Sequence, residues 1–300
     1  MADTTVITGS TPRWLMPAFF VVLWSTGFIV AKFGLPYAPP LTFLLLRCTC
    51  VLLVLLPLLL LWRAPWPHGR VLHIAVAGLL LQAGYLGGVW SAIKIGMPAG
   101  LSALIVGMQP ILTAVAAPLV GERVRPRQWL GLVLGLGGVG LVVASKMQLD
   151  GLSLAAILYC VLALLSITAG TLYQKRYCPS FDLRTGTAIQ FAVSVAALLP
   201  FAILLEQFDL SLSKVEWSAS FVGALLWSVF ALSIGAIFLL FRLISRGAAL
   251  EVTSLLYLTP PTTAIMAWLL FGETLGPLAL VGMVVAVAGV AFVVKKQEKS

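Results

Sequence analysis

The chain has 300 residues, of which 61% are hydrophobic and only 10% are charged, and its mean hydropathy is +1.07. Soluble globular proteins carry about 25% charged residues, so this composition excludes an ordinary soluble domain and predicts an integral membrane protein. The net charge of +9 comes from basic residues scattered at the ends of apolar runs. That distribution is typical of a membrane-topology signal rather than of a nucleic-acid-binding patch.

Ten apolar runs long enough to cross a bilayer as helices follow the N-terminal tail. A transmembrane helix needs about 20 apolar residues, and the short connections between the runs leave no room for a soluble domain. The tail lacks the pattern of a cleaved signal peptide, so we expect the first run to remain as a helix. The predicted spans are 14–33, 41–62, 71–93, 98–120, 127–145, 152–173, 183–205, 217–241, 248–271 and 276–294.

Ten spans place both chain ends on the same side of the membrane. With the N-terminus in the cytoplasm, 14 of the 19 Lys and Arg residues fall on the cytoplasmic side and 4 on the other. Cytoplasmic connections of membrane proteins carry an excess of Lys and Arg. The sequence therefore predicts cytoplasmic tails at 1–13 and 295–300.

The second half of the chain repeats the first. Glycines, prolines and a Gly-Glu pair recur in order, first at an offset of 143 residues and then at 151. This pattern predicts two five-span repeats, at 14–146 and 151–294, and because five is odd the second repeat enters the membrane inverted. Inverted repeats around a mid-membrane site are common in secondary transporters. The pairs include Lys32 with Lys175, Pro57 with Pro200, Pro110 with Pro261, Glu122 with Glu273 and Pro126 with Pro277.

The two Gly-Glu turns differ in charge. Arg123, Arg125 and Arg127 follow the first turn, whereas no basic residue lies between Glu273 and Gly282. Basic residues are favoured on the cytoplasmic side only. The difference is therefore expected if the two turns face opposite sides of the membrane.

Four segments, taken in order, carry a family resemblance. They read WSTGFIVAKFGL, PPLTFLLLRC, GMPAGLSALIVGMQPILTAVAAPLVGERV and TSLLYLTPPTTAIMAWLLFGETL. Over nearly the whole chain they resemble the ten-helix, EamA-type branch of the drug/metabolite transporter superfamily. Within it, the chain is most similar to bacterial inner-membrane exporters of aromatic and other neutral amino acids.

The resemblance implies an all-α membrane bundle with a central substrate cavity. Helices 1, 3, 4, 6, 8 and 9 of such proteins surround the cavity, and helices 5 and 10 lie at the periphery. The arginine that the family carries in its second helix falls on Arg47. The equivalent position of the second repeat holds Gln190, which makes this pair asymmetric.

Polar side chains inside the spans are the candidates for substrate contact, because polar groups are costly in lipid and should face the bundle interior. Amide and hydroxyl groups can bind the charged ends of a zwitterion, and aromatic rings stack on a ring or attract an ammonium. This set suits a neutral amino acid, although Ser and Thr within helices also bond back to their own helix. The candidates are Trp24, Ser25, Gln82, Tyr85, Gln109, Tyr159, Thr168, Ser228 and Tyr257.

Three further embedded residues have a structural and a functional interpretation. Pro110 and Pro261 each remove a helical hydrogen bond, and we predict that they act as hinges during gating or else as static kinks. Arg47 has no acidic residue within a neighbouring span core. We expect it to bind backbone carbonyls, with substrate or gate contact as the alternative.

No acidic residue lies in the middle of a span, and Glu251, near the start of the ninth span, comes closest. Proton-coupled exchange of cations normally uses an embedded carboxylate. The sequence therefore favours facilitated export of neutral amino acids across a bacterial inner membrane over efflux of drugs or quaternary ammonium ions.

Other function classes are disfavoured by the residues present. The four cysteines and two histidines lack the spacing of metal ligands, and no catalytic motif occurs, so we expect no enzyme, metal or cofactor. A non-transporting membrane sensor or scaffold stays as the alternative from another class. The sequence leaves the oligomeric state open and is compatible with a monomer.

Overall fold

The computed structural model describes residues 15–116, 118, 126–150, 152–178, 180–235, 239, 258–274 and 276–294. Within these ranges the regular elements are all helices, which confirms the all-α fold. Several residues singled out in the sequence lie outside the described ranges: Glu122, Arg123, Arg125, Glu251 and Tyr257.

The described helices fall into the ten predicted spans. Within those ranges, four spans are long and apolar enough to cross a bilayer by length and composition alone, and the other apolar helices are shorter. The helices of the first repeat are α1 (Leu15–Gly34), α2 (Pro40–Trp62), α3 (Val71–Gly78), η1 (Leu79–Gly84), α4 (Tyr85–Lys94), α5 (Ala99–Val106), α6 (Gln109–Val115) and α7 (Pro126–Asp150). Those of the second are α8 (Leu154–Tyr177), α9 (Leu183–Glu206), α10 (Ala219–Leu226), η3 (Trp227–Gly235), α13 (Thr259–Phe271) and α14 (Pro277–Val294).

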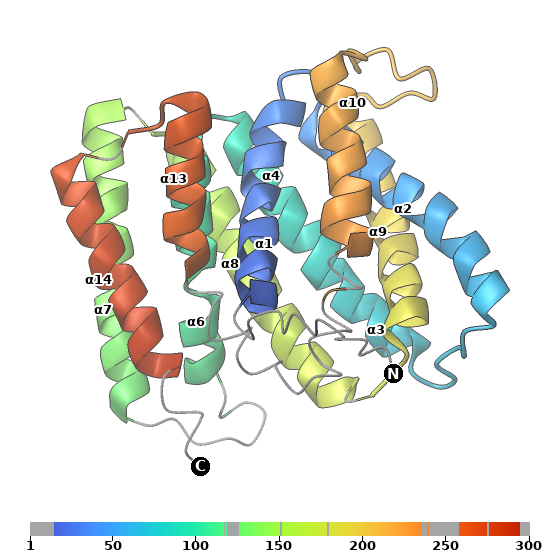
Figure 1. Ribbon diagram of the computed structural model, residues 1–300, viewed down its shortest axis with the longest axis horizontal. Coiled ribbons are helices and arrows are strands. Elements are labelled where there is room, and N and C mark those ends of the chain that lie inside the picture. The colour runs from blue at the N-terminus through green and yellow to red at the C-terminus, as the bar shows by residue number, and fades with distance from the viewer. Residues whose placement is uncertain are drawn as a thin grey trace, which may run out of the picture.

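The two repeats run in opposite directions through the bundle. In Figure 1, α1 rises from the lower end of the molecule to the upper end, whereas its repeat counterpart α8 descends. The start of α1 and the end of α14 lie at the same, lower end. This arrangement agrees with an even number of spans and with an inverted second repeat.

Prolines mark the beginnings of several helices. Pro39 and Pro98 immediately precede α2 and α5, and Pro126 and Pro277 are the first residues of α7 and α14. Proline is favoured at the first helical position, because the N–H that it lacks would have no partner inside the helix. Since Pro126 and Pro277 are repeat-equivalent, both repeats begin their fifth helix with the same signal.

The fifth helices of the two repeats pack directly against each other at one side of the molecule (Figure 1). Glycines allow this approach: a Cβ on Gly289 would lie 2.7 Å from the Gly135 nitrogen, and one on Gly282 would lie 2.6 Å from the Gly138 carbonyl oxygen. Small residues let membrane helices approach closely enough for backbone contact. The position of α7 and α14 at one side agrees with the peripheral position that the resemblance implies for helices 5 and 10.

The fourth span is two helices rather than one. α5 ends at Val106, and α6 begins at Gln109 after a turn at Gly107 and Met108, so Pro110 lies in the first turn of α6. In the second repeat, Pro261 lies in the first turn of α13. Neither proline therefore interrupts a helix at its own position, because a first-turn N–H needs no helical acceptor.

Candidate functional site

A cavity of about 350 Å³ lies among α1, α2, η1, α4, α8, α9 and η3. Small-molecule pockets in proteins typically measure about 300–1,000 Å³, so this cavity suits a small solute. Both repeats contribute to its wall, as expected for a transporter site. The aromatic residues of the lining are Phe20, Trp24, Phe28, Tyr85, Trp90, Phe181 and Phe191.

The described wall comes from helices 1, 2, 3, 6, 7 and 8, which differs from the set that the resemblance implies. Helices 4 and 9 instead pack on each other: a Cβ on Gly100 would lie 3.1 Å from Ala264 Cα, and one on Gly107 would lie 2.9 Å from Pro260 Cγ. Among the described residues, none of the cavity lining comes from these two helices. Helices 2 and 7 contribute Arg47 and Gln190 to the described wall.

Three of the predicted contact residues meet at this cavity. Trp24 comes from α1, Gln82 from η1 and Tyr85 from the start of α4. Trp24 is 37% exposed, and Tyr85 is 7% exposed. Among the described residues, the Gln82 amide and the Tyr85 hydroxyl have no hydrogen-bond partner, so both remain available to a solute.

Three hydroxyl-bearing candidates lie away from the described wall. The Ser25 hydroxyl donates to the Val21 carbonyl at 2.8 Å, and the Thr168 hydroxyl donates to the Leu164 carbonyl at 2.7 Å. Ser228 is fully buried, and its hydroxyl has no partner among the described residues. Bonding back to the same helix is a common fate of mid-helix Ser and Thr.

Gln109 and Tyr159 also lie outside the described lining. The Gln109 Nε2 donates to the Thr171 hydroxyl at 3.0 Å, which links α6 to α8. Tyr159 is 42% exposed on the outer surface of α8. Tyr257 lies outside the described residues.

Further polar residues complete the lining, among them Arg47, for which the sequence offers substrate contact only as the alternative. Arg47 of α2 lies at the cavity and is only 7% exposed, and its Nε and Nη2 both donate to the Ser233 hydroxyl, at 3.3 and 3.1 Å. Gln190 and Gln174 also line the cavity, and the Gln190 Nε2 donates to the Gln174 Oε1 at 3.0 Å. The internal repeat relates these lining positions to one another: Arg47 corresponds to Gln190 at the offset of 143 residues, and Gln82 corresponds to Ser233 at the offset of 151.

Both Gln82 and Ser233 sit in π-helical segments. η1 interrupts the third span, and η3 occupies the equivalent part of the eighth. The Ser233 hydroxyl donates to the Ser228 carbonyl, five residues back, at 2.9 Å. π-Helical turns occur frequently at functional sites, and here each repeat contributes one polar lining residue to the same cavity from such a segment.

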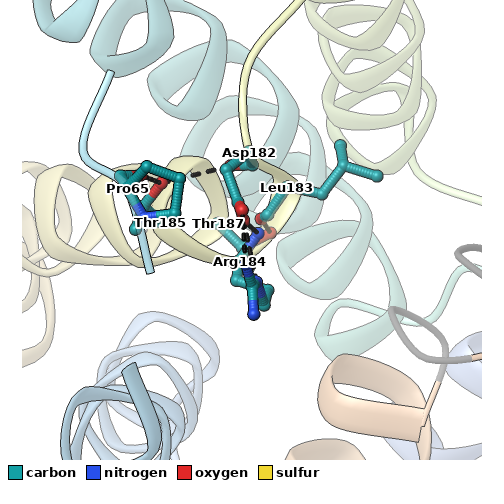
Figure 2. Close-up of polar contacts among 6 residues, drawn as sticks. All are labelled: Pro65, Asp182, Leu183, Arg184, Thr185 and Thr187. Atoms are coloured by element: carbon teal, nitrogen blue, oxygen red, sulfur yellow. Dashed lines mark hydrogen bonds and ion pairs between the residues drawn. The ribbon is translucent and has the colours of Figure 1, made fainter. Parts of the chain in front are cut away.

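The start of α9 contributes lining residues to the cavity, and Figure 2 shows the polar contacts around it. Asp182 caps the helix by accepting from the Arg184 backbone N–H at 2.9 Å, and it also accepts from the Arg184 guanidinium at 3.0 and 2.6 Å. The hydrogen bond from the Arg184 side chain lowers the pKa of the Asp182 carboxyl. The Thr185 hydroxyl donates to the Pro65 carbonyl at 2.9 Å. These contacts hold Leu183 and Thr187, which line the cavity.

The opposite end of the bundle is held by charged contacts. Lys32, at the end of α1, forms an ion pair with Glu273, which follows α13. The same carboxylate accepts from the Ala99 N–H of α5 at 3.4 Å. Lys94 donates to the Leu35 carbonyl at 2.6 Å. Helices from both repeats are therefore tied together here, whereas the cavity extends toward the α8–α9 connection, where Phe181 lines it.

The electrostatic character of the site is cationic. Among the lining residues that the structure describes, Arg47 is the one charged side chain, and none is acidic. Within the described ranges no group of three His, Cys, Asp or Glu side chains could hold a metal ion. The described wall therefore offers one guanidinium, several amide and hydroxyl groups, and aromatic rings.

Comparisons with known proteins give matches that extend over nearly the whole chain. The model of the EamA-like transporter family matches residues 14–144 and again 154–295. The "Probable amino-acid metabolite efflux pump" of Salmonella typhimurium is 27% identical over 274 residues, covering 90% of each chain. The "Uncharacterized inner membrane transporter YedA" of Escherichia coli K12 is 29% identical over 287 residues, covering 94% of this chain and 92% of that protein.

Further similarity supports the same fold. The "Uncharacterized transporter YvbV" of Bacillus subtilis is 28% identical over 292 residues, covering 95% of this chain and 92% of that protein. A solved structure described as "Crystal structure of protein" superposes with a TM-score of 0.64 at 19% identity, covering 95% of this chain and 98% of that one. At this identity, the superposition shows a shared fold.

Proposed function

This chain belongs to the EamA-like transporter family, and from that premise we propose that it exports aromatic and other neutral amino acids by alternating access through the cavity. Family membership makes the protein a multi-pass membrane transporter rather than an enzyme. Our proposal concerns the substrate, the direction of transport and the residues of the site.

One observation carries the proposal: Trp24, Gln82 and Tyr85 converge on a cavity whose wall comes from both repeats. The aromatic rings can enclose a flat apolar side chain, and ring contacts contribute beyond the area that they bury. The amides of Gln82, Gln174 and Gln190 can hydrogen-bond the polar end of the solute. Two relatives named "Probable amino-acid metabolite efflux pump" are compatible with this substrate class.

We propose that transport is facilitated rather than proton-driven. The described lining contains no carboxylate that could exchange a proton for the solute. Proton relays in membrane proteins usually rely on embedded Asp, Glu or His chains. Glu251 lies outside the described residues and is the residue to test if a proton gradient proves necessary.

Pro110 and Pro261 are the proposed hinges. Each lies in the first turn of its helix, next to the contact between Gly107 and Pro260 that joins the two repeats. Replacing either proline by alanine lets the preceding turn join the helix, so we expect slower transport with little loss of stability. Rates of uptake into vesicles check this, and unchanged rates in both variants would remove the hinge role.

We further propose that the protein resides in a bacterial inner membrane with both tails in the cytoplasm, and that its two units span 14–146 and 151–294. The distribution of Lys and Arg supports this orientation. Reporter proteins fused at the two ends would give equal cytoplasmic signals. A cytoplasmic signal at one end only would contradict the even number of spans.

Reconstitution in liposomes tests the function directly. We expect saturable flux of radiolabelled phenylalanine without an ion gradient, with competition by other neutral amino acids. Empty liposomes give the background. Competition by a quaternary ammonium dye, together with a requirement for a proton gradient, would instead assign the protein to drug efflux.

A further inference from the structure

We propose that Arg47 and Ser233 form a carboxylate-binding subsite in the cavity, so that the transporter selects organic carboxylates with an apolar body and does not require an ammonium group on them. The inference rests on the proposed function only in that the cavity admits a small solute. For Arg47 the sequence favours a structural role and offers substrate contact as the alternative. The proposal chooses the alternative.

The guanidinium of Arg47 keeps unused donors at the cavity. Arginine carries five N–H donors, and those bonded to Ser233 come from Nε and Nη2 only. Within the described ranges no other side chain or carbonyl accepts from Arg47. Because Arg47 lines the cavity, the remaining N–H groups can reach a bound solute.

An embedded arginine without an acidic partner is energetically costly. A charged side chain inside the bilayer is disfavoured, and arginine stays charged in proteins. No acidic side chain belongs to the described cavity wall. A carboxylate provides the missing countercharge and matches the planar guanidinium in a two-point hydrogen bond.

Ser233 orients the guanidinium rather than neutralising it. Its hydroxyl accepts from Arg47 and donates to the Ser228 carbonyl, so its single proton is already in use. A serine in this position fixes the side chain of Arg47 without a charge of its own. The cationic group is thus held in place while its charge remains available to a ligand.

The repeat-equivalent position is neutral, so the two related lining positions differ in charge. Gln190 occupies the position that corresponds to Arg47, and its amide bonds to Gln174. One of these lining positions therefore carries a positive charge, and its repeat equivalent carries an amide. A carboxylate placed at Arg47 directs the rest of the solute along the aromatic wall, which includes Trp24 and Tyr85.

This arrangement predicts which solutes bind. A carboxylate on an apolar body satisfies Arg47 whether or not it also carries an ammonium. A cation of the same size finds a like charge and no described acidic partner, so it is disfavoured. Phenylpropionate should therefore bind more tightly than phenethylamine or phenylalanine amide.

Competition and direct binding with the purified protein in liposomes and detergent test the inference. The four probes are phenylalanine, phenylpropionate, phenethylamine and phenylalanine amide. In the wild type we expect phenylpropionate to bind at least tenfold more tightly than phenethylamine. In Arg47→Gln, which copies the residue of the second repeat, this preference should fall by about tenfold or more, as expected for loss of a charged hydrogen bond.

Three further variants serve as controls and keep the test valid if Arg47→Gln does not fold. Arg63→Gln removes the same charge at the end of the same helix, away from the cavity, and should leave the preference unchanged. Ser233→Ala retains the charge but frees the guanidinium, so it should weaken phenylpropionate binding less than Arg47→Gln does. If Arg47→Gln does not fold, Arg47→Lys provides the comparison, because it keeps the charge and loses the two-point geometry.

The outcomes separate the inference from the proposed function. Equal binding of phenylalanine and its amide, or an unchanged preference in Arg47→Gln, would overturn the subsite. Binding of phenylpropionate through Arg47 without any phenylalanine flux would overturn amino-acid export and leave the subsite intact. Phenylalanine flux with loss of the preference in Arg47→Gln would support both.

Discussion

Asp182 shows how a single side chain holds the start of a helix that lines the cavity. It caps α9 and pairs with Arg184, and Thr185 on the same turn anchors to Pro65. An N-cap side chain accepts from a backbone N–H that has no partner inside the helix. Because Leu183 and Thr187 line the cavity from this turn, a local capping contact sets the position of two lining side chains.

We predict that Asp182→Ala lowers stability by about 1 kcal/mol, the usual cost of losing an N-cap, and that Asp182→Asn, which keeps an acceptor, costs less. The folded-state pKa of Asp182 is lowered, so its contribution is present above the ordinary aspartate value of about 3.9 and is lost as the pH falls below it. Thermal unfolding in detergent at pH 7 and pH 3 checks this. A difference between wild type and Asp182→Asn that grows on acidification would contradict it.

Tyr85 and Thr168 are both candidate substrate contacts by sequence, but Tyr85 lines the cavity, whereas the Thr168 hydroxyl bonds to its own helix. Tyr85→Phe removes a hydroxyl that faces the cavity without a described partner, so we expect a several-fold higher KM for the substrate and unchanged stability. Thr168→Val removes a hydroxyl that is already bonded to Leu164, so we expect unchanged KM. Liposome uptake kinetics check both, and the reverse pattern would place the substrate elsewhere.

At the scale of whole elements, the contact between α7 and α14 depends on backbone approach. Gly131 and Gly138 of α7 correspond to Gly282 and Gly289 of α14 in the repeat. Gly138 contacts Gly282, and Gly289 contacts Gly135 and Gly131. Side chains on these positions would separate the helices and lose the packing that holds membrane helices together. The internal repeat of the sequence therefore corresponds to a roughly symmetric contact between the two helices.

Neighbouring glycines on α7 give a matched test of this contact. A Cβ on Gly138 would collide with the backbone of Gly282 and Ala286, whereas one on Gly137 would have nothing within 4 Å. We predict that Gly138→Ala lowers stability by about 1–3 kcal/mol and that Gly137→Ala raises it by up to about 1 kcal/mol through helix propensity. Unfolding in detergent measures both, and equal effects would show that the contact is not tight.

At the scale of the whole molecule, the two ends of the bundle differ. Lys32, Glu273 and Ala99 join α1, α13 and α5 at one end, while the cavity extends toward the other. The proposed alternating-access mechanism requires that such contacts break when this end opens. The ion pair between Lys32 and Glu273 is therefore the contact whose loss should shift the balance between states.

We predict that Glu273→Gln favours opening of this end. The pair is partly exposed, at 29% and 16% for the two side chains, so a contribution of about 1 kcal/mol is reasonable, which is roughly a fivefold change in population. Spin labels at Pro36 and Leu278 should show an added longer distance. Glu216→Gln, which removes an exposed carboxylate near the same end, should leave the distances unchanged, and a change in that control alone would refute the role of the pair.

The sequence by itself determined the class of this protein, its ten spans, its two inverted repeats and its family. Each of these follows from patterns that repeat along the chain: apolar runs of bilayer length, and glycines, prolines and Gly-Glu pairs that recur in order. Hydrophobic length and turn residues act locally, so they can be read without knowing which helices touch. The family model matching twice agrees with that internal repetition.

Only the tertiary structure decided which polar side chains share the cavity. Sequence patterns identify polar residues inside spans but not the direction in which each points around its helix. Trp24, Gln82 and Tyr85 converge on the cavity, whereas the hydroxyls of Ser25 and Thr168 bond to their own helices. Ser233 reaches Arg47 across 186 residues of chain because a π-helical segment and the packing of η3 on α2 bring them together. Such long-range contacts depend on helix rotation and on the packing of all neighbours at once, which no local pattern records.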